Sequence, residues 1–403
     1  MKKKILILIK SMNIGGAERS LLNMLYLIDQ NRYDIDLMIY RHQGEFMHLI
    51  PNHINILPEI KEYSVFETPF KKLLLSKNFF YIFLKIFAKI DFFIKEKVFK
   101  NTFTSSWILQ QYIYKYIVPL LPAINTKEYD VAVNYLGVPD ILIKKVKAKG
   151  KITWIHTDYS KISANENMDI KHFSKVNYII NVSNDCNNIF LSKYPMFKSK
   201  SLVIENMLSK EFIKKQVAQF YPKEFNKNDI KLLSIGRFGK AKNFDNIPEI
   251  CHLLIKNGLN NIKWYLIGYG NDEELIKNRI KEFKVENSVI ILGKKTNPYP
   301  YIKHCNLYIQ PSRYEGKSVT VIEAQLLNKP VVISNYATSQ SQLENGVDGI
   351  ILPMETKLFA SELVNIILDQ KLQSKLIENT KKRDYTNKNE LNKIYNLFDT
   401  NFK

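Results

Sequence analysis

Two glutamates eight residues apart combine carboxylate chemistry with the start of a helix. Glu315 lies in the loop after a predicted strand at 306–310, and Glu323 lies inside the helix expected to begin near Ser318. A carboxylate offers two acceptor oxygens and therefore suits the vicinal hydroxyl groups of a sugar. The free backbone N–H groups at a helix start favour an anion such as phosphate. This spacing indicates a site that binds sugar hydroxyls and a phosphate together.

Two cations follow an earlier strand of the same half. Arg237 and Lys242 lie in the loop 236–243, between a predicted strand and a helix. Arginine presents a planar fork of donors, and lysine presents a compact point charge. At the carboxyl edge of a sheet the two side chains would suit a diphosphate. A solvated basic loop is the alternative interpretation.

Glycines occur at further strand ends. Gly15 and Gly16 separate the first predicted strand from a helix, where backbone amides can approach a phosphate closely. This junction has neither the glycine spacing of a dinucleotide-binding fingerprint nor the lysine of a P-loop. Gly268 and Lys294 lie in turns after two later strands, where a flat base could lie against the backbone.

Short apolar runs that alternate with helical patterns must position these residues. The runs lack polar–apolar alternation, as expected when helices cover both faces of a parallel sheet, so we predict an α/β protein with two doubly wound units. The predicted strands cover residues 4–10, 33–40, 129–135, 151–156, 177–182 and 202–205, and then 231–235, 262–267, 288–292, 306–310, 330–334 and 349–352.

The domain boundaries follow from changes in composition. The first domain is expected to cover residues 1–206 and to carry a helical aromatic and basic insert at 70–121. The polar stretch 207–229 is the predicted linker, and the second domain covers 230–385. A last helix over 386–403 is expected to dock back on the first domain.

In their order along the chain, the motifs resemble glycosyltransferase family 4, retaining nucleotide-sugar enzymes of the GT-B fold. The resemblance covers most of the chain except the insert, and it implies two Rossmann-like domains with a cleft between them. Segments 154–159 and 336–339 are similar to bacterial surface-polysaccharide members. The motifs that carry the resemblance are Gly15-Gly16-Ala17-Glu18-Arg19, the pair Arg237 and Lys242, Gly268-Tyr269-Gly270, and Glu315 with Glu323.

The resemblance also implies residue roles. Arg237 and Lys242 would hold the donor diphosphate, Glu323 the ribose and Glu315 the transferred sugar, while His156 would line the reaction centre. The expected catalytic residues are His156 and Glu315, and the expected donor-binding residues are Gly15, Gly16, Asn206, Arg237, Lys242, Gly268, Lys294, Gly316, Lys317, Ser318, Val319 and Glu323. Lys317 and Asn243 depart from the family pattern, so the identity of the sugar is left open.

The expected reaction is a retaining, metal-independent transfer of hexosyltransferase type. Departure of the diphosphate would be stabilised by the two cations and the helix start, without a metal or other cofactor. By resemblance, the donor is a nucleotide-sugar, with a UDP-sugar favoured, and the acceptor is a glycan or lipid-linked molecule in bacterial cell-surface polysaccharide biosynthesis. A nucleic-acid-binding protein and another GT-B-like nucleotide-sugar enzyme, such as an epimerase, are the alternatives.

Composition limits the class of protein. The chain has 403 residues, a formal net charge of +20 and a pI near 9.5, with 45% hydrophobic residues. These values exclude a disordered or collagen-like chain. Three distant cysteines give no disulfide framework, and no stretch approaches the ~20 apolar residues of a membrane span, so a cytoplasmic protein is expected. Its positive charge would bind an anionic partner. Because the sequence contains no nucleic-acid-binding signature, this partner is not expected to be a nucleic acid.

The insert 70–121 is dense in Phe, Ile, Leu, Tyr and Lys at helical spacing. A basic amphipathic hairpin suited to an anionic membrane surface is one interpretation, which would place the protein at the inner face of the cell membrane. An ordinary helical pair packed on the first domain is the other. Over 71–100 the acids Asp91 and Glu96 face the basic residues Lys71, Lys72, Lys77, Lys85, Lys89, Lys95, Lys97 and Lys100.

Overall fold

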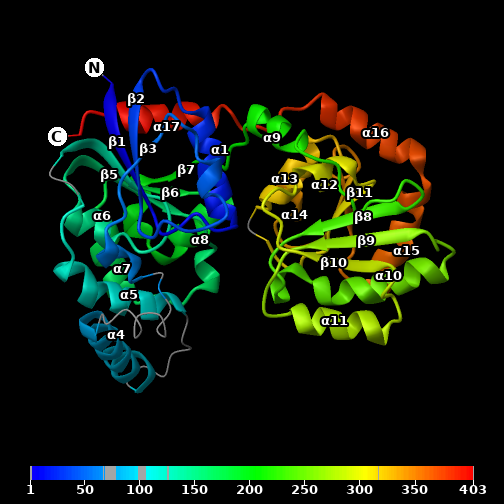
Figure 1. The fold of residues 1–403 in the computed structure, drawn as a ribbon, viewed down its shortest axis with the longest axis horizontal. Coiled ribbons are helices and arrows are strands. Elements are labelled where there is room, and N and C mark those ends of the chain that lie inside the picture. Colours follow the sequence, from blue (N-terminus) through cyan, green and yellow to red (C-terminus); the bar gives the residue numbers. More distant parts are fainter. Residues whose placement is uncertain are drawn as a thin grey trace. The chain divides into compact units, whose positions relative to one another are not determined.

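The computed structural model describes residues 2–66, 68, 79–98, 106–124, 127–315 and 317–402. The chain forms two compact units, one made of Met1–Met207 with Lys388–Lys403 and the other of Leu208–Asn387. Each unit has a parallel sheet with helices on both faces, so the predicted α/β architecture with two doubly wound units is confirmed (Figure 1).

The N-terminal unit is built on a seven-stranded sheet of order β3-β2-β1-β4-β5-β6-β7. All of its strand pairs are parallel, and residues Ile5–Ile9 of the central strand are buried because both faces are covered. The strands are β1 (Lys3–Ile9), β2 (Tyr33–Ile39), β3 (Asn55–Ile56), β4 (Tyr129–Asn134), β5 (Ala148–Ile155), β6 (Tyr178–Asn181) and β7 (Ser201–Val203).

Side-chain caps begin several helices of this unit. Ser183 accepts a hydrogen bond from the Cys186 amide at the start of α8, and Asn165 accepts one from the Met168 amide at the start of α7. The helices are α1 (Gly16–Leu27), α2 (Lys61–Ser64), α4 (Phe79–Phe92) with the π-helical turn Phe93–Val98, α5 (Ser106–Ile117), α6 (Asp140–Lys145), α7 (Glu166–Phe173), α8 (Asn184–Lys193) and α17 (Glu390–Asp399).

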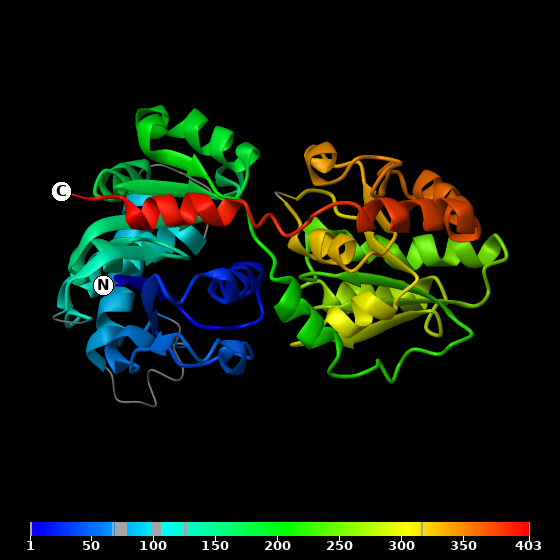
Figure 2. The ribbon, with the colours of Figure 1, turned by 90° about the horizontal axis from the view of Figure 1, so that it is seen from above.

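The last helix belongs to this unit. Figure 2 shows α17 lying along the N-terminal unit, where Tyr395 stacks on Tyr33 with ring centroids 5.3 Å apart. Arg32 and Asp399 form an ion pair at 2.6 Å at the same place. The helix therefore covers the part of the sheet at which β2 begins.

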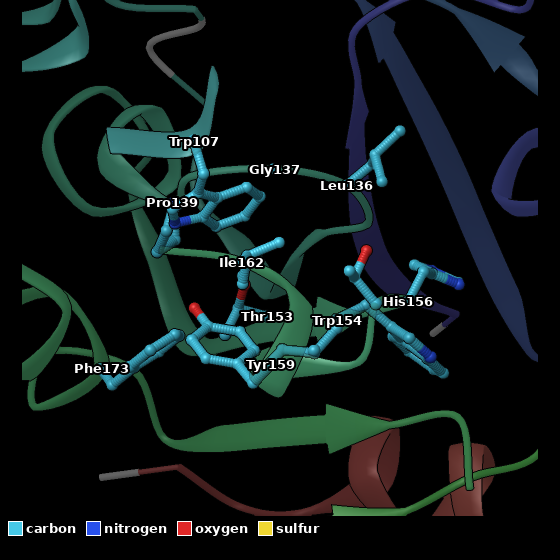
Figure 3. Close-up of a pocket in the computed structure, with 12 residues that line it drawn as sticks. Trp107, Leu136, Gly137, Pro139, Thr153, Trp154, His156, Tyr159, Ile162 and Phe173 are labelled. Carbon is cyan, nitrogen blue, oxygen red and sulfur yellow. The ribbon is translucent and has the colours of Figure 1, made fainter. Parts of the chain in front are cut away.

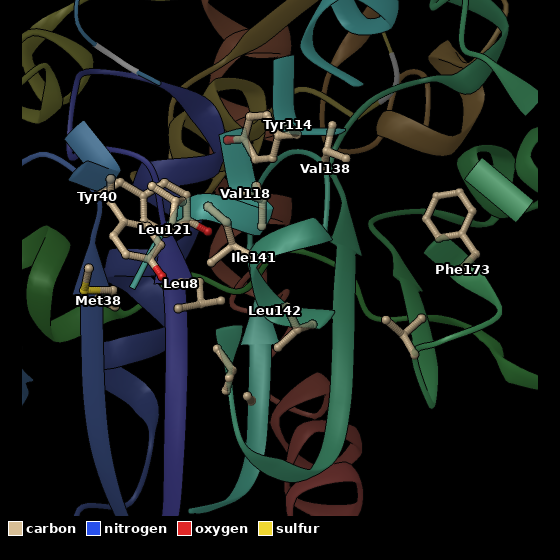
Figure 4. Close-up of a cluster of buried hydrophobic side chains, with 14 of the residues drawn as sticks. Leu8, Met38, Tyr40, Tyr114, Val118, Leu121, Val138, Ile141, Leu142 and Phe173 are labelled. Atoms are coloured by element: carbon tan, nitrogen blue, oxygen red, sulfur yellow. The ribbon is translucent and has the colours of Figure 1, made fainter. Parts of the chain in front are cut away.

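Part of the predicted insert is core. Tyr114 of α5 and Val118 and Leu121 just after it are buried with Leu8, Met38 and Ile141 in one cluster (Figure 4). Helix α4 packs against α5 and buries little besides Ile82 and Ala88. Within the described residues, no helix has the length and apolar character needed to cross a membrane.

The C-terminal unit is built on a six-stranded parallel sheet of order β10-β9-β8-β11-β12-β13. Its strands are β8 (Ile230–Ile235), β9 (Ile262–Ile267), β10 (Val289–Gly293), β11 (Leu307–Gln310), β12 (Val331–Ser334) and β13 (Ile350–Leu352). Its helices are α9 (Lys210–Val217), α10 (Ile247–Lys256), α11 (Glu273–Glu282), α12 (Tyr299–His304), α13 (Val319–Leu326), α14 (Ser339–Gln342), α15 (Thr356–Leu368) and α16 (Gln370–Lys381).

The structure differs from the predicted linker at 207–229, because residues from Leu208 onward fold with the C-terminal unit. Phe212 of α9 meets the ring of Tyr299 edge to face at 6.0 Å between centroids. Phe225 is buried against Tyr265 at 4.6 Å. The few apolar residues of this polar stretch are spaced so that each of these rings reaches the core.

In each sheet, the direction in which successive strands are added reverses at one point. Strand order reverses between β1 and β4 in the N-terminal unit and between β8 and β11 in the C-terminal unit. Loops that leave neighbouring strands at such a point diverge to opposite faces, which leaves room for a ligand beyond the carboxyl ends of the strands. The predicted loops 236–243 and 311–318 both begin at the second of these points.

Candidate active site

An ion pair joins the two loops at the strand-order reversal of the C-terminal unit. The Lys242 ammonium contacts Oε1 of Glu315, and their side chains are 21% and 10% exposed. Lys242 ends a short 3-10 helix (Lys240–Lys242) after β8, while Glu315 follows β11. The sequence assigned these residues to a diphosphate and a sugar separately, and the structure brings them into direct contact.

A chain of buried polar side chains supports Glu315 from β11. The Ser312 hydroxyl donates to Glu315 Oε1 at 2.7 Å, and Gln310 Nε2 donates to the Ser312 hydroxyl at 3.0 Å. The Tyr308 hydroxyl donates to Gln310 Oε1 at 2.8 Å. Gln310 and Ser312 are fully buried. Sequence reasoning missed both, although two polar residues at the end of an apolar strand were a usable signal.

The donors converge on one oxygen of Glu315. Lys242, Ser312 and the more distant Gln310 amide all contact Oε1, and within the described residues Oε2 has no hydrogen-bond partner. The Thr338 hydroxyl fixes the backbone by donating to the Glu315 carbonyl at 2.8 Å. The carboxylate is thus held firmly through one oxygen and can accept from a ligand through the other.

Arg237 has a different environment. Its side chain is exposed and makes no hydrogen bond or ion pair with any residue that the structure describes. Its loop packs closely on the turn after β9, because a Cβ on Gly268 would lie 1.9 Å from the Gly236 carbonyl oxygen. The Phe238 amide donates to the Tyr269 carbonyl at 2.8 Å. Gly268 is therefore required for the packing of the loop that carries Arg237.

Glu323 lies in the interior of the unit. It is fully buried in α13 and accepts a hydrogen bond from the Tyr299 hydroxyl at 2.8 Å. At the start of this helix, the Ser318 amide donates to Gln342 Oε1 at 2.6 Å. The predicted ribose contact of Glu323 stays a prediction, and a ligand would share this carboxylate with Tyr299.

The remaining predicted residues of this unit lie at its edge. Lys317 and Val319 flank Ser318 at the start of α13, and Gly316 lies outside the described residues. The Lys294 ammonium lies 4.8 Å from the ring centroid of Tyr269. Lys294 and the turn after β9 are therefore neighbours, as the predicted base-binding edge requires.

In the N-terminal unit, Gly15 and Gly16 form the start of α1 at the strand-order reversal. A Cβ on Gly15 would lie 2.2 Å from Glu18 Oε2, so the Glu18 carboxylate folds over the helix start. A negative side chain there complements the helix dipole. A phosphate at this place, which the sequence predicts, would have to displace it.

Asn206 is tied to the same helix. The Ser20 hydroxyl donates to Asn206 Oδ1 at 2.6 Å and lies 3.0 Å from the Tyr135 hydroxyl. These bonds join α1 to the segment after β7 and to the residue after β4. Asn206 is therefore positioned beside Gly16 and its helix, within the N-terminal unit.

His156 lines a small pocket at the carboxyl end of β5. Figure 3 shows it on one side of the pocket, with Trp107 and Tyr159 on the other. Burial lowers the pKa of His156 to about 4, against the effect of its hydrogen bond to the Tyr135 backbone. The imidazole is therefore neutral near pH 7. Its Nε2 is buried and has no partner in the described part of the chain, so it can act as an acceptor.

The sequence contains one Asp-x-Asp triplet, Asp34-Ile35-Asp36 in β2. Asp36 is buried and accepts hydrogen bonds from Tyr129 at 2.7 Å and from Lys127 at 3.0 Å. The described residues include no cluster of three or more His, Cys, Asp or Glu that could hold a metal. Metal independence stays a prediction.

Comparison with known proteins supports the motif assignment. Residues 216–383 match the family model for glycosyl transferases group 1, which confirms the predicted resemblance for the C-terminal unit. An uncharacterized glycosyltransferase of Methanocaldococcus jannaschii is 26% identical over 260 residues, covering 57% of this chain and 60% of that protein. The poly(ribitol-phosphate) alpha-N-acetylglucosaminyltransferase of Staphylococcus aureus is 28% identical over 187 residues, covering 44% of this chain and 37% of that protein. The matches thus span less than two thirds of the length of these relatives.

Solved structures resemble the whole chain. A mutant of S. aureus TarM in complex with fondaparinux, alpha-GlcNAc-glycerol and UDP superposes with a TM-score of 0.65 at 16% identity, covering 99% of this chain and 100% of that one. Anabaena HepE in complex with UDP and glucose gives 0.62 at 16% identity, covering 98% and 99%. At this identity the likeness concerns the fold, which is the predicted GT-B type with two Rossmann-like domains.

Coupling between Lys242 and Glu315 can be measured by a double-mutant cycle. We expect Lys242→Met and Glu315→Gln each to lower the free energy of unfolding of the C-terminal unit, because each leaves a poorly exposed charge unpaired. The double variant should lose about 1–2 kcal/mol less than the sum of the two single losses. Urea unfolding followed by Trp264 fluorescence reports this unit. The exposed pair Lys277 and Glu274, at 2.8 Å, is the control and should couple by less than about 0.5 kcal/mol. Equal coupling in both cycles would contradict the prediction.

The pKa of His156 predicts a pH dependence of stability. The unfolded chain binds a proton near pH 6.5 that the folded unit excludes until about pH 4. Stability is therefore fully present above pH 6.5 and falls by about 3 kcal/mol as the pH drops through this window. His156→Gln should remove this fall in urea unfolding followed by Trp107 and Trp154 fluorescence.

The exposed His42 provides the control for this experiment. His42→Gln should keep the wild-type pH dependence, because this exposed side chain lies outside the pocket that buries His156. A His156→Gln protein whose stability falls below pH 6.5 as steeply as that of the wild type would show that the imidazole is not excluded from protonation.

Proposed function

We propose that this chain is a glycosyltransferase that moves a sugar from a nucleotide-sugar to a glycan or lipid-linked acceptor, with retention of configuration and without a metal. The observation that carries the proposal is the pair Lys242 and Glu315, in the segment that matches group 1 glycosyltransferases. Arg237, in the same loop as Lys242, has no partner among the residues that the structure describes. Two cations and a sugar-accepting carboxylate then share the carboxyl edge of one sheet.

The favoured donor is a UDP-sugar. TarM has been solved with UDP and HepE with UDP and glucose, and both share this fold over nearly the full chain. Relatives named for poly(ribitol-phosphate) and capsular polysaccharide support an acceptor in bacterial surface-polymer synthesis. The sugar itself is left open, since Lys317 and Asn243 depart from the family pattern.

The cations would act on the leaving group. An ammonium has three donor hydrogens, so Lys242 can keep its contact with Glu315 while donating to a phosphate oxygen. Arg237 can add a planar pair of donors at no cost in broken ion pairs. Both charges would stabilise the diphosphate as its bond to the sugar breaks, and the oxocarbenium-like centre would be attacked from the same face.

Glu315 would orient the transferred sugar. Oε1 is held by Ser312 and Lys242, so Oε2 is the oxygen that would accept from a sugar hydroxyl. His156, neutral and with an open Nε2, is kept as a predicted reaction-centre residue that would accept from a hydroxyl group. Fixed acceptors of this kind lower the cost of ordering the sugar in the transition state.

The first test is turnover of UDP-sugars by loop variants. Arg237→Ala and Lys242→Ala should each lower kcat/KM by roughly 30- to 1,000-fold, about 2–4 kcal/mol, because a fixed donor to the developing anion is removed. Lys240→Ala is the matched control, since this exposed lysine lies in the same turn and should leave kcat/KM within about threefold. Similar activity in all three variants would exclude the assigned diphosphate site.

The second test concerns metal and stereochemistry. Turnover should be unchanged by EDTA and by added Mn²⁺ or Mg²⁺, and NMR of the first product should show the anomeric configuration of the donor. Loss of activity in EDTA with recovery on adding Mn²⁺ would contradict the metal-independent mechanism. A product with inverted configuration would contradict retention, and conversion of the nucleotide-sugar to its epimer would favour the alternative enzyme class.

A further inference from the structure

Helix α4 is apolar on its outer face as well as on its inner face. Its inner side packs against α5 and buries Ile82 and Ala88. Along its outer side and the turn that follows, large apolar side chains are between 42% and 64% exposed. These residues, here called the α4 outer face, are Phe79, Phe80, Phe83, Ile86, Phe87, Ile90, Phe93 and Ile94.

The outer face forms a continuous stripe. Phe79, Phe83, Ile86 and Ile90 recur at spacings of three and four residues, which places them one above another on a helix. The rings of Phe83 and Phe87 stack with centroids 6.4 Å apart and an angle of 22° between their planes. A helix packed on a soluble protein normally turns polar side chains outward, so a stripe of this size marks an interaction surface.

Three of the described lysines near this face make contacts within the unit. The Lys85 ammonium donates to the Val65 carbonyl at 2.7 Å and so holds α4 to the segment before it. Lys95 and Lys115 contact Asp91 at 2.8 and 3.0 Å. These three lysines are therefore engaged in contacts within the unit, and the exposed side of α4 described above is apolar.

The charges around the face favour an anionic partner. Among the described side chains of residues 79–124, Asp91 is the one acid, and it is 13% exposed and contacted by Lys95 and Lys115. The described lysines of this stretch, Lys85, Lys89, Lys95 and Lys115, outnumber that acid, so its described side chains carry a net positive charge. A second copy of the chain would bring two positively charged surfaces together, whereas anionic lipid headgroups complement them.

We propose that the α4 outer face inserts shallowly into the interface of an anionic membrane. Aromatic and aliphatic side chains enter the boundary between headgroups and acyl chains, while the net positive charge of the described residues favours anionic headgroups. The helix has 14 residues, so it is about 21 Å long and would lie along the surface. Figure 1 shows α4 at the end of the N-terminal unit, with α5 between it and the sheet.

The experiment is vesicle flotation of the full chain. Vesicles of phosphatidylcholine alone are compared with vesicles of phosphatidylcholine and phosphatidylglycerol in equal amounts, at low and high salt. We expect the wild type to bind the anionic vesicles more tightly and to keep part of its binding in high salt, because apolar insertion is not screened. No donor or acceptor is present, so the result is independent of the proposed transfer reaction.

The variant carries Phe83→Ser and Ile90→Ser, which change two exposed side chains and leave the buried face of α4 intact. Its partition onto anionic vesicles should fall at least tenfold, while its thermal unfolding matches the wild type. The control carries Leu358→Ser and Leu368→Ser on α15, which are 52% and 62% exposed in the other unit, and should bind like the wild type. Lys85 is left unchanged because it anchors α4.

Three outcomes would overturn the proposal. The first is a wild type that does not float with anionic vesicles. The second is equal binding by the wild type and the α4 variant. The third is a concentration-dependent dimer, seen by analytical ultracentrifugation, that the α4 variant abolishes while vesicle binding is absent, since this would make a second copy the occupant of the face.

Discussion

Neutralising the carboxylate of Glu315 is the constraint on which the C-terminal site depends. With a side chain only 10% exposed, this carboxylate has little water to stabilise its charge. Lys242 and Ser312 supply the donors instead, and Gln310 and Tyr308 extend the chain of hydrogen bonds into β11. Because Lys242 follows β8 and Glu315 follows the adjacent β11, the ion pair also fixes both loops at the point where the strand order reverses.

The N-terminal unit presents a chemically different edge at its own reversal point. Several neutral groups lie there: Ser20, Tyr135 and Asn206 share hydrogen bonds, and His156 is kept uncharged by burial. The one acid at the helix start, Glu18, lies where an anion would otherwise be favoured. Lys10 follows β1 and Arg19 lies in the first turn of α1, so this edge carries cations as well as neutral acceptors.

Sequence patterns predicted the sheets well because buried parallel strands are continuous apolar runs. The predicted strand at 262–267 coincides with β9, whereas β3 was missed because two edge residues give no pattern. The pairing of Lys242 with Glu315 could not be read from the sequence, since these residues are 73 positions apart and meet only through the sheet order. The prediction of a linker at 207–229 was wrong for a similar reason. Phe212 and Phe225 pack against Tyr299 and Tyr265, which are distant in the sequence.

Helix α4 shows why composition alone left its role open. A count of lysines describes the insert as basic, but the structure assigns Lys85 to a backbone carbonyl and Lys95 to Asp91, both of which hold the helix in place. Helix α5 contributes side chains such as Tyr114 to the core of the unit. Helix α4 buries only Ile82 and Ala88. Selection for stability would favour polar residues on the remaining surface, since exposed apolar groups gain nothing from folding. The exposed Phe and Ile side chains contribute little to the packing of the unit, and the proposed membrane contact would give them a role.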